Sequence, residues 1–248
     1  VTVNGEHQYD EMGNVILPLF WSDRTKEFPV DRYGDETAPY QERKEAWTSL
    51  LLYNSTYVTA DPLKFLLREG ENIIRVTNIS GDGLEGGKLA VTAPAQEPAE
   101  YADYRTAHSD KPAGAFLKIK AVEYVEKNTS QAIYSSENNP VAEPYDSYYK
   151  KLNTLSWTKA GTEVEYQFEA PEEGLYQIAV CYKNDKEEFS VFNTIRIDGE
   201  IPFRELKNYV FPSTGSQWAN EVLSDENGDP FQIYLTAGGH TISIRTET

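Results

Sequence analysis

The chain has 248 residues and a formal net charge of −17, from 40 acidic and 23 basic side chains. A charge of this sign repels nucleic-acid phosphates and anionic lipid headgroups, so it favours neutral partners such as sugars, or cations. Tyrosine accounts for 17 residues. Because Tyr is common in strands and on wet binding surfaces, the composition favours β structure, and the length suits one or two domains.

Short segments with a strand pattern recur along the chain. Several of them alternate apolar with polar residues, as half-buried strands do. They lie at 15–17, 63–67, 72–76, 88–92, 163–168, 175–182, 193–197, 232–235 and 241–245. Turn dipeptides such as Asn4-Gly5 and Asp198-Gly199 fall between them. The sequence shows no long helical periodicity, so it predicts an all-β chain of the sandwich or jelly-roll type.

An internal repeat indicates the domain organisation. Three landmarks recur in the same order. In the first copy they are the turn Val3-Asn-Gly-Glu6, Trp47 and a strand–Gly–strand segment that starts at Pro62. In the second copy they are the turn Ile197-Asp-Gly-Glu200, Trp218 and a strand–Gly–strand segment that starts at Pro230. The first copy carries an insertion, Ser22 to Glu45, that we expect to be loop-like. The repeat predicts two tandem homologous β-sandwich modules.

The predicted modules occupy 1–92 and 114–248, joined by a linker at 93–113. We expect the first module to be incomplete at its N-terminus and to hold only the C-terminal part of a module, as in a fragment of a longer precursor. The linker contains Tyr101 and Tyr104 within 98–107, which predicts a short helix or packed connector.

The sequence offers few candidates for chemistry. The single cysteine, Cys181, lies in an apolar strand pattern and is predicted to be a small buried residue. His240 follows Gly238-Gly239 and is predicted to face solvent in a turn, and the three His residues lack the spacing of metal ligands. Asp225 to Asp229 predicts a hairpin turn rather than a calcium loop. Adjacent acidic residues such as Glu172 and Glu173 point to opposite faces of a strand, so we expect no enzyme.

The aromatic residues provide the strongest indication of function. Residues 138–149 form a predicted loop with Asn, acidic side chains and three tyrosines, Tyr145, Tyr148 and Tyr149, and Trp157 follows closely. Aromatic faces stack on the C–H side of sugar rings, while amides and carboxylates hold the hydroxyls. Loops on a rigid sandwich often carry binding. We therefore predict a carbohydrate site here; the alternative is that these rings cover the end of the sandwich.

The second module resembles a known family through an ordered set of segments. They include Ala121-Val-Glu-Tyr124, Trp157-Thr-Lys-Ala-Gly161, Glu173-Gly-Leu-Tyr176, Ile195-Arg-Ile-Asp-Gly199 and Leu235-Thr-Ala-Gly-Gly-His-Thr-Ile242. This set resembles the galactose-binding-like β-sandwich of carbohydrate-binding module families 6 and 35. Residues 194–203, 208–211 and 225–230, with Trp218, look like the accessory modules that precede the solute-binding domain in some Gram-positive sugar-transporter lipoproteins. The resemblance covers nearly all of 114–248.

The resemblance implies a secreted, non-catalytic jelly roll on the surface of a Gram-positive bacterium. A glycan would be its partner, and further domains of the same chain would accompany it. The sequence itself has no apolar run long enough to span a bilayer, so we expect no membrane-spanning segment. It also implies that Asn184, at a strand end, contacts sugar, and that a structural Ca²⁺ is bound. The family's opening Glu-Ala-Glu corresponds to Lys120-Ala-Val-Glu123 here, which leaves Glu123 as the expected metal ligand. The alternative function is a structural spacer with no ligand of its own.

Overall fold

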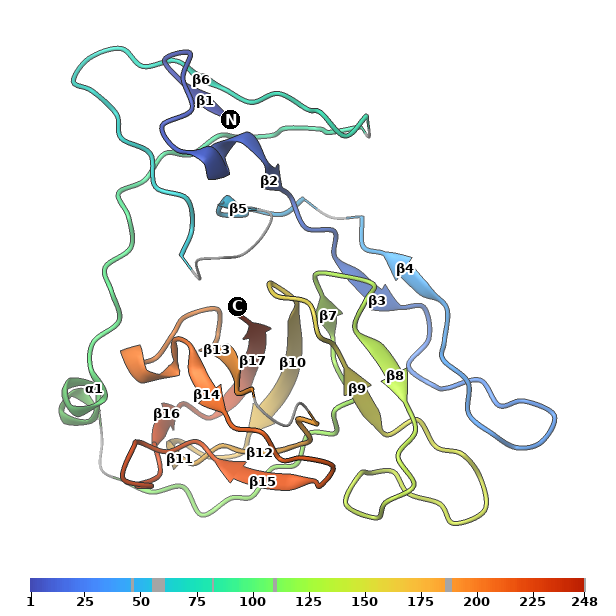
Figure 1. Cartoon of the computed structure of the whole chain (residues 1–248). Helices are drawn as coiled ribbons and strands as arrows, with labels where there is room; N and C mark the ends of the chain where they lie inside the picture. Colours follow the sequence, from blue (N-terminus) through green and yellow to red (C-terminus); the bar gives the residue numbers. More distant parts are fainter. Residues whose placement is uncertain (46, 55–60, 82, 109–110, 186–188, 248) are drawn as a thin grey trace. The chain divides into compact units, whose positions relative to one another are not determined.

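The computed structural model describes residues 1–45, 47–54, 61–81, 83–108, 111–185 and 189–247. The chain divides into two compact units (Figure 1): unit 1 comprises 1–18 and 45–96, and unit 2 comprises 19–44 and 97–248. Strands and turns dominate both units, which confirms the predicted all-β class. In this division, residues 19–44 and 97–113 group with unit 2. A tandem pair of sandwich modules stays a prediction.

Unit 2 is organised around one large sheet of seven antiparallel strands. In spatial order these are β14 (Tyr209–Phe211), β13 (Val191–Ile197), β17 (Gly238–Thr246), β10 (Glu163–Ala170), β7 (Glu126–Lys127), β3 (Trp21–Asp23) and β4 (Gln41–Arg43). Shorter pairs join β11 (Gly174–Tyr176) to β16 (Ile233–Leu235), β12 (Ala179–Tyr182) to β15 (Ala219–Val222), and β8 (Ile133–Ser135) to β9 (Thr154–Ser156). The helices are α1 (Tyr101–Ala107) and the 3-10 turn η2 (Arg204–Leu206).

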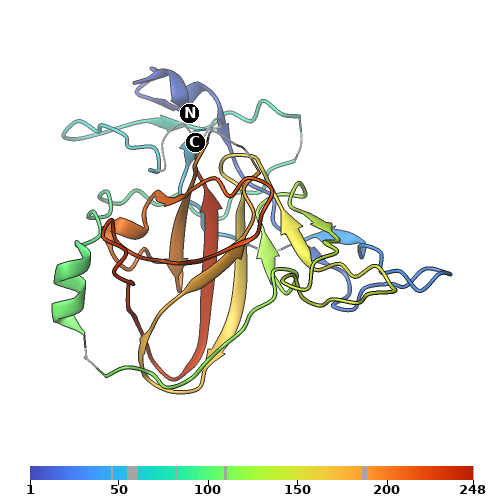
Figure 2. The same cartoon turned by 60° about the horizontal axis from the view of Figure 1, so that its bottom comes forward.

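Strand β17 is paired along both of its edges. It lies between β10 and β13, and Figure 2 shows it in red between the yellow and orange strands. Ile242 pairs with Tyr166 of β10 and with Ile197 of β13. In β10 the buried Val164 and Tyr166 alternate with polar residues, because successive side chains of a strand point to opposite faces. The apolar face of these strands is therefore directed into the unit.

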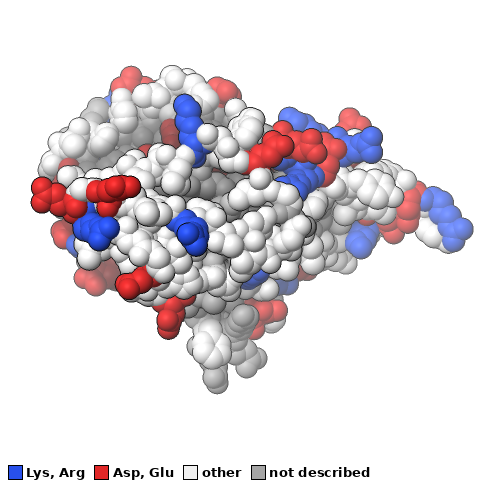
Figure 3. Space-filling model, turned by 90° about the horizontal axis from the view of Figure 1, so that it is seen from above, with Lys and Arg blue, Asp and Glu red and all other residues white. Residues whose placement is uncertain are grey.

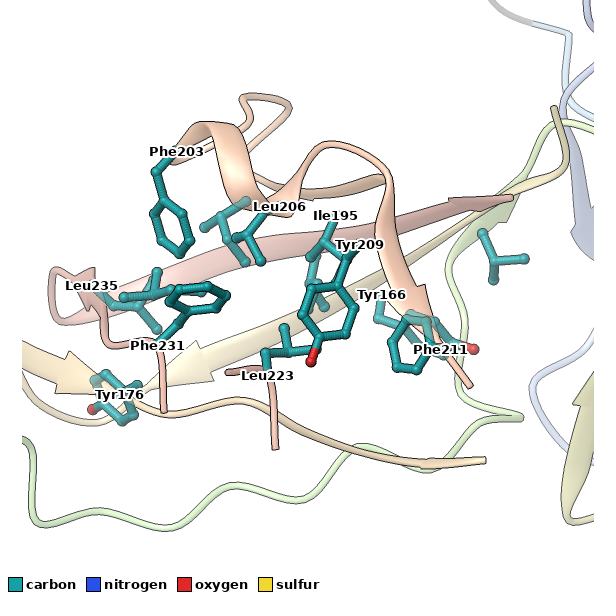
Figure 4. Close-up of a cluster of buried hydrophobic side chains, with 14 of the residues drawn as sticks. Tyr166, Tyr176, Ile195, Phe203, Leu206, Tyr209, Phe211, Leu223, Phe231 and Leu235 are labelled. Atoms are coloured by element: carbon teal, nitrogen blue, oxygen red, sulfur yellow. The ribbon is translucent and has the colours of Figure 1, made fainter. Parts of the chain in front are cut away.

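The hydrophobic core of unit 2 lies between this sheet and the shorter strands (Figure 4). Ile195 of β13 is fully buried, and Ile233 of β16 is 1% exposed. Phe203 and Phe231 pack with their ring centroids 5.0 Å apart. Burying each such side chain stabilises the fold by about 1.5–3 kcal/mol. The core therefore gives a stable base for the loops that leave the sheet.

Helix α1 packs on this core, as its two tyrosines predict. The Tyr101 ring lies 4.8 Å from Phe203 and 4.7 Å from Phe231, between ring centroids. Its hydroxyl accepts a hydrogen bond from the backbone N–H of Gln232 at 2.8 Å. The hydroxyl of Tyr104 accepts one from the backbone N–H of Tyr234 at 2.9 Å. The predicted packed helix is confirmed, and it is part of unit 2.

The insertion at 22–45 was expected to be loop-like, but its ends form the strands β3 and β4 at the edge of the large sheet. Trp21 pairs with Lys127 of β7. Asp23 accepts hydrogen bonds from the hydroxyls of Tyr124 and Tyr134. Burial raises the pKa of both tyrosines, and the bonds to Asp23 raise it further. Lys127 is 1% exposed and donates to the carbonyl of Ala132; burial lowers its pKa to about 8. Polar contacts thus attach the insertion to the sheet.

Cys181 is exposed, so its predicted burial is wrong. In β12, Val180 and Tyr182 are the half-buried residues that pack on the core. Alternation along the strand then directs Cys181 outward. An apolar stretch of sequence does not by itself reveal which of its residues face the core.

Unit 1 has smaller elements than unit 2. They are β1 (Thr2–Val3), η1 (Asp10–Gly13), β2 (Val15–Ile16), β5 (Tyr53–Asn54) and β6 (Ile74–Arg75). β1 pairs with β6, and β2 pairs with β5. Among the described residues of unit 1, Val3 and Met12 are the buried hydrophobic side chains. Unit 1 therefore has little core of its own.

Charged side chains of both signs are mixed on the face shown in Figure 3. Lys and Arg lie among Asp and Glu there, without a large basic patch. In the part of the chain that the structure describes, no helix is long and apolar enough to cross a membrane.

An aspartate–histidine pair joins the turn that follows β13 to the start of β17. His240 is 8% exposed, so its predicted solvent-facing position is wrong. Its Nδ1 lies 2.7 Å from Oδ2 of Asp198, and its Nε2 lies 2.9 Å from the carbonyl of Thr236. Burial alone would lower the pKa of His240, but the hydrogen bonds to Asp198 and Thr236 raise it above 6.5 overall. Both partners are acceptors, so protonated His240 can donate to them from both ring nitrogens at the start of β17.

A raised pKa in the folded state makes the stability of unit 2 depend on pH. The contribution of His240 is fully present below pH 6.5, the ordinary pKa, and is lost as pH rises through the raised pKa. The double variant Asp198→Asn, His240→Asn copies the neutral pair Asn4 and Asn72 of unit 1, whose side chains are 3.0 Å apart. We expect the unfolding free energy of this variant, measured by urea titration, to fall less steeply above pH 6.5 than that of the wild type. An unchanged slope would contradict this assignment.

Candidate functional site

The predicted tyrosine loop connects β8 to β9 in unit 2. These strands pair antiparallel, with Ser135 opposite Thr154. The two hydroxyls are 2.7 Å apart, which closes the base of the loop. Residues 136–153 between the strands form the candidate binding loop.

A buried asparagine shapes the inside of the binding loop. Asn153 is 3% exposed, and its Oδ1 accepts a hydrogen bond from the backbone N–H of Glu137 at 2.8 Å. Its Nδ2 donates to the carbonyls of Glu137 at 2.9 Å, Ala142 at 3.3 Å and Pro144 at 3.0 Å. A loop lacks the backbone–backbone hydrogen bonds of a sheet, and here the Asn153 side chain supplies partners for the backbone groups of the loop instead. Sequence reasoning missed Asn153, whose partners are visible only once the loop is folded.

An Asx turn positions the tyrosines at the tip of the loop. Oδ1 of Asp146 accepts hydrogen bonds from the backbone N–H groups of Tyr148 at 2.8 Å and Tyr149 at 3.1 Å. These bonds lower the pKa of Asp146, because they stabilise its charged form. Tyr148 is 90% exposed, Tyr149 50% and Tyr145 40%. The turn therefore presents aromatic rings to solvent on an ordered backbone.

A second segment, far away in the sequence, supports the binding loop. The hairpin between β3 and β4 (residues 24–40) brings Glu36 to the loop, where its backbone N–H donates to the carbonyl of Lys150 at 2.9 Å. The Glu36 carboxylate accepts from the ammonium of Lys151 at 2.9 Å and from the backbone N–H of Leu152 at 3.0 Å. Asp35 accepts from the backbone N–H of Lys150 at 2.9 Å. The predicted insertion therefore forms the support of the predicted site.

A glycine in the same hairpin makes room for Tyr149. Gly34 has a φ of +91°, and a Cβ atom there would lie 2.6 Å from Cε1 of the Tyr149 ring. Such a contact is too close for any side chain, so the ring occupies the space that the glycine leaves. Tyr149 thereby packs against the hairpin.

The binding loop surrounds a shallow hollow of about 250 Å³. Its lining is mixed, with tyrosine rings beside carboxylate, amide, hydroxyl and ammonium groups. The lining residues are Ser136, Glu137, Asn138, Tyr145, Asp146, Ser147, Tyr148, Tyr149, Lys150, Lys151 and Asn153. The three predicted tyrosines thus meet at one hollow.

The two carboxylates of the hollow are both held in their charged form. Glu137 accepts a hydrogen bond from the ammonium of Lys183 at 2.8 Å, and this contact lowers its pKa. The pKa of Asp146 is lowered by the backbone N–H groups of its turn. Both groups are therefore hydrogen-bond acceptors and poor proton donors at neutral pH.

Trp157 and Asn184 do not line the hollow. The Trp157 indole packs on the core cluster, and its Nε1 donates to Oγ1 of Thr246 at 2.7 Å. Asn184 is 8% exposed, and its Nδ2 donates to the carbonyl of Phe189 at 2.8 Å. Its backbone N–H donates to Oγ1 of Thr214 at 2.9 Å. The structure gives these two predicted site residues packing and loop-shaping contacts.

The surroundings of Glu123 do not fit a calcium ion. Its carboxylate accepts from the ammonium of Lys120 at 2.8 Å and from the backbone N–H of the same residue at 3.3 Å. Desolvation acts to raise the pKa of Glu123, but these contacts with Lys120 lower it overall. Calcium prefers roughly six to eight oxygen ligands, whereas the described residues hold no group of three or more His, Cys, Asp or Glu suited to a metal. Lys120 already supplies the positive charge beside Glu123.

No protein-family model matches the chain, and no curated protein matches it significantly. Among solved structures, a family 35 carbohydrate-binding module from Clostridium thermocellum is 19% identical, with 53% of this chain and 86% of that chain covered and a TM-score of 0.38. A CBM35 from Paenibacillus barcinonensis is 18% identical, with 49% and 81% covered and a TM-score of 0.34. A GH26-CBM35 β-(1,4)-mannanase from Podospora anserina is 14% identical, with 56% and 25% covered and a TM-score of 0.30.

The contacts of Asn153 can be tested by comparing two asparagine variants. We expect Asn153→Ala to lower the unfolding free energy by about 1–3 kcal/mol, because it leaves buried backbone groups without partners. The exposed Asn138 lies in the same loop, so Asn138→Ala is the matched control and should change the unfolding free energy by less than about 0.5 kcal/mol. Urea denaturation measures both. Equal effects would mean that Asn153 does not organise the loop.

Proposed function

We propose that the hollow of the binding loop binds carbohydrate and that the chain carries out no catalysis. The observation that supports this most strongly is the 90% exposure of Tyr148 on a turn that Asp146 holds in place. A large ring that stays in water after folding contributes little to the core. Fixed beside polar groups, it suits a ligand with both an apolar face and hydroxyls, and sugar rings have both.

The ordered backbone favours binding by lowering its entropic cost. Association loses free energy when side chains and loops must be immobilised, and a preformed loop avoids part of this loss. Asn153, Asp146 and Glu36 fix the loop at three places through the hydrogen bonds described above. The tyrosine backbone is therefore positioned before any ligand arrives.

The polar lining supplies partners for hydroxyl groups. Asn138 offers an amide, Ser147 a hydroxyl and Glu137 a charged acceptor at the hollow. The hollow of about 250 Å³ is smaller than typical small-molecule pockets, which are about 300–1,000 Å³. This size favours contact with one sugar ring over enclosure of a long glycan.

The charge state of the carboxylates favours binding over hydrolysis. A glycosidase needs one carboxylic acid with a raised pKa to protonate the leaving oxygen. The pKa values of Glu137 and Asp146 are both lowered. Neither group is suited to that role, so the hollow has acceptors for hydroxyls but no general acid.

The expected affinity is modest. A stacked ring adds about 0.5–1.5 kcal/mol beyond area burial in aromatic pairs. One or two rings with a few hydrogen bonds correspond to dissociation constants of about millimolar to micromolar. Binding of this strength becomes effective through avidity when several modules are linked. We accordingly propose that the chain acts as an accessory region of a longer protein.

The cellular setting is part of the proposal and is supported by the sequence resemblance. It is a secreted or cell-surface protein of a Gram-positive bacterium, with a sugar-transporter solute-binding lipoprotein as its specific form. The net charge of −17 agrees with a neutral glycan as partner rather than a polyanion.

A pair of tyrosine variants tests the site. We expect Tyr148→Ala to weaken binding on a glycan array by about two- to tenfold, the equivalent of one lost ring contact. Tyr40 is 85% exposed, lies in the same unit and does not line the hollow. Tyr40→Ala is therefore the control and should bind as the wild type does. A blank array from folded wild-type protein, with and without Ca²⁺, would refute glycan binding and favour the structural spacer.

A further inference from the structure

Unit 1 repeats one corner of unit 2 in the same strand register. Val3 of β1 pairs with Ile74 of β6, and Ile197 of β13 pairs with Ile242 of β17. These are the equivalent residues of the internal sequence repeat. The next pair along, Thr2 with Arg75, likewise corresponds to Arg196 with Ser243. Strand β6 is thus the counterpart of the central part of β17.

The hydrogen bonds of the two corners also correspond. The backbone N–H of Asn4 donates to the carbonyl of Ile73 at 2.8 Å, and Asp198 donates to Thr241 at 3.0 Å in the same way. The Asn4 side chain accepts from the N–H of Ile73 at 2.9 Å, as the Asp198 side chain does from Thr241 at 2.9 Å. These shared details make unit 2 a valid template for unit 1.

The two corners differ on the other edge of the equivalent strand. β17 has β13 on one edge and β10 on the other, whereas the described residues give β6 a single neighbour, β1. In unit 2, β10 places Tyr166 opposite Ile242 and Val164 opposite Ile244. The corresponding positions of unit 1 are Ile74 and Val76. We call the side of residues 73–77 that faces away from β1 the β6 edge.

Apolar side chains around the β6 edge remain in water. Val76 is 53% exposed and Ile73 60%. Phe65 is only half-buried, although its counterpart Ile233 is 1% exposed in unit 2. An open edge with apolar neighbours is a template for pairing with another strand.

We propose that the β6 edge binds an extended polypeptide strand from outside residues 1–248. The strand runs antiparallel to β6 and repeats the pattern of β10, in which Val164 and Tyr166 alternate with acidic residues. Its apolar side chains cover Ile74 and Val76. Its backbone completes the hydrogen bonds of the edge, as in other cases of strand addition.

Charge selects an acidic strand over a second copy of β6. In unit 2, Glu165 lies opposite Ser243, whose counterpart in unit 1 is Arg75. An acidic residue at the position of Glu165 would therefore face a basic one. Two β6 strands paired with Ile74 opposite Val76 would instead place Arg75 opposite Arg75, and like charges directly opposite are destabilising.

The experiment is to supply the strand within the same chain. The eight residues of β10, Glu163–Ala170, are fused ahead of Val1 through a Gly/Ser linker of about 15 residues, whose end-to-end distance is roughly 20 Å. Hydrogen exchange then compares the fused and unfused chains. The Ile73 amide already bonds to Asn4 on the β1 side, so the amides of Ile74 and Val76 are the ones that face the open edge. We expect these two amides to exchange about tenfold more slowly in the fused chain. The amides of β17 should not change, because β10 already occupies their edge.

Two controls make the result specific. In the first, the fused segment has the same eight residues rearranged so that all polar ones precede all apolar ones. In the second, Arg75→Glu in the fused chain reverses the charge at the edge. Both controls should lose most of the protection. Absence of protection in the original fusion, or equal protection by the rearranged segment, would overturn the proposal. Sedimentation tests whether the unfused chain dimerises. A dimer that Arg75→Glu alters would assign the β6 edge to a second copy of the chain and would also overturn the proposal.

Discussion

The pairing of β17 along both edges is the constraint on which unit 2 depends. With β10 on one side and β13 on the other, the apolar residues of three adjacent strands face the same way. The core can then form between them and the shorter strands, and α1 can pack its tyrosines on that core. Unit 1 illustrates the same constraint by contrast. Among its described residues, the equivalent strand β6 has one neighbour, and Ile73 and Val76 stay exposed. The comparison of the two units thus indicates that burial of the core depends on pairing of the central strand along both of its edges.

The candidate site is positioned by polar contacts rather than by the core. Asn153 organises the inside of the binding loop, Asp146 forms its tip, and Glu36 holds it from outside. These three side chains form hydrogen bonds with backbone groups of the loop. The tyrosine rings are therefore the main surface that the loop presents to a ligand. The backbone hydrogen bonds to Asp146 lower its pKa, so the contacts that shape the tip of the loop also make this carboxylate unsuited to acid catalysis.

Local patterns made the class and several elements predictable. Alternation identified β10, and the presence of Tyr101 and Tyr104 predicted a short helix or packed connector. The predictions for Cys181 and His240 were wrong because burial there depends on strand register and on the partner Asp198, which lies 42 residues away. The tyrosine loop was identified by composition alone.

The support for that loop could not have been predicted, since it depends on long-range contacts. The Glu36 contacts join segments more than a hundred residues apart, with a separation of 116 to Leu152. No local pattern in 24–40 indicates where its carboxylates would bind. The repeat itself extends further than its turn motif suggests: Asn14 and Pro18 correspond to Asn208 and Pro212. The weak similarity of the intervening residues conceals this match until the strands are aligned.

The route of the chain through the two units has a consequence for its cleavage and its evolution. The chain leaves unit 1 after Pro18, returns at Glu45 and leaves again after Gln96. The chain therefore crosses between the units three times. A single protease cut at one crossing leaves the units covalently joined through the other two. No single truncation point separates the units into two intact pieces. A gene rearrangement that moved one unit to another protein would therefore carry part of the other unit with it, so the two are expected to be inherited together.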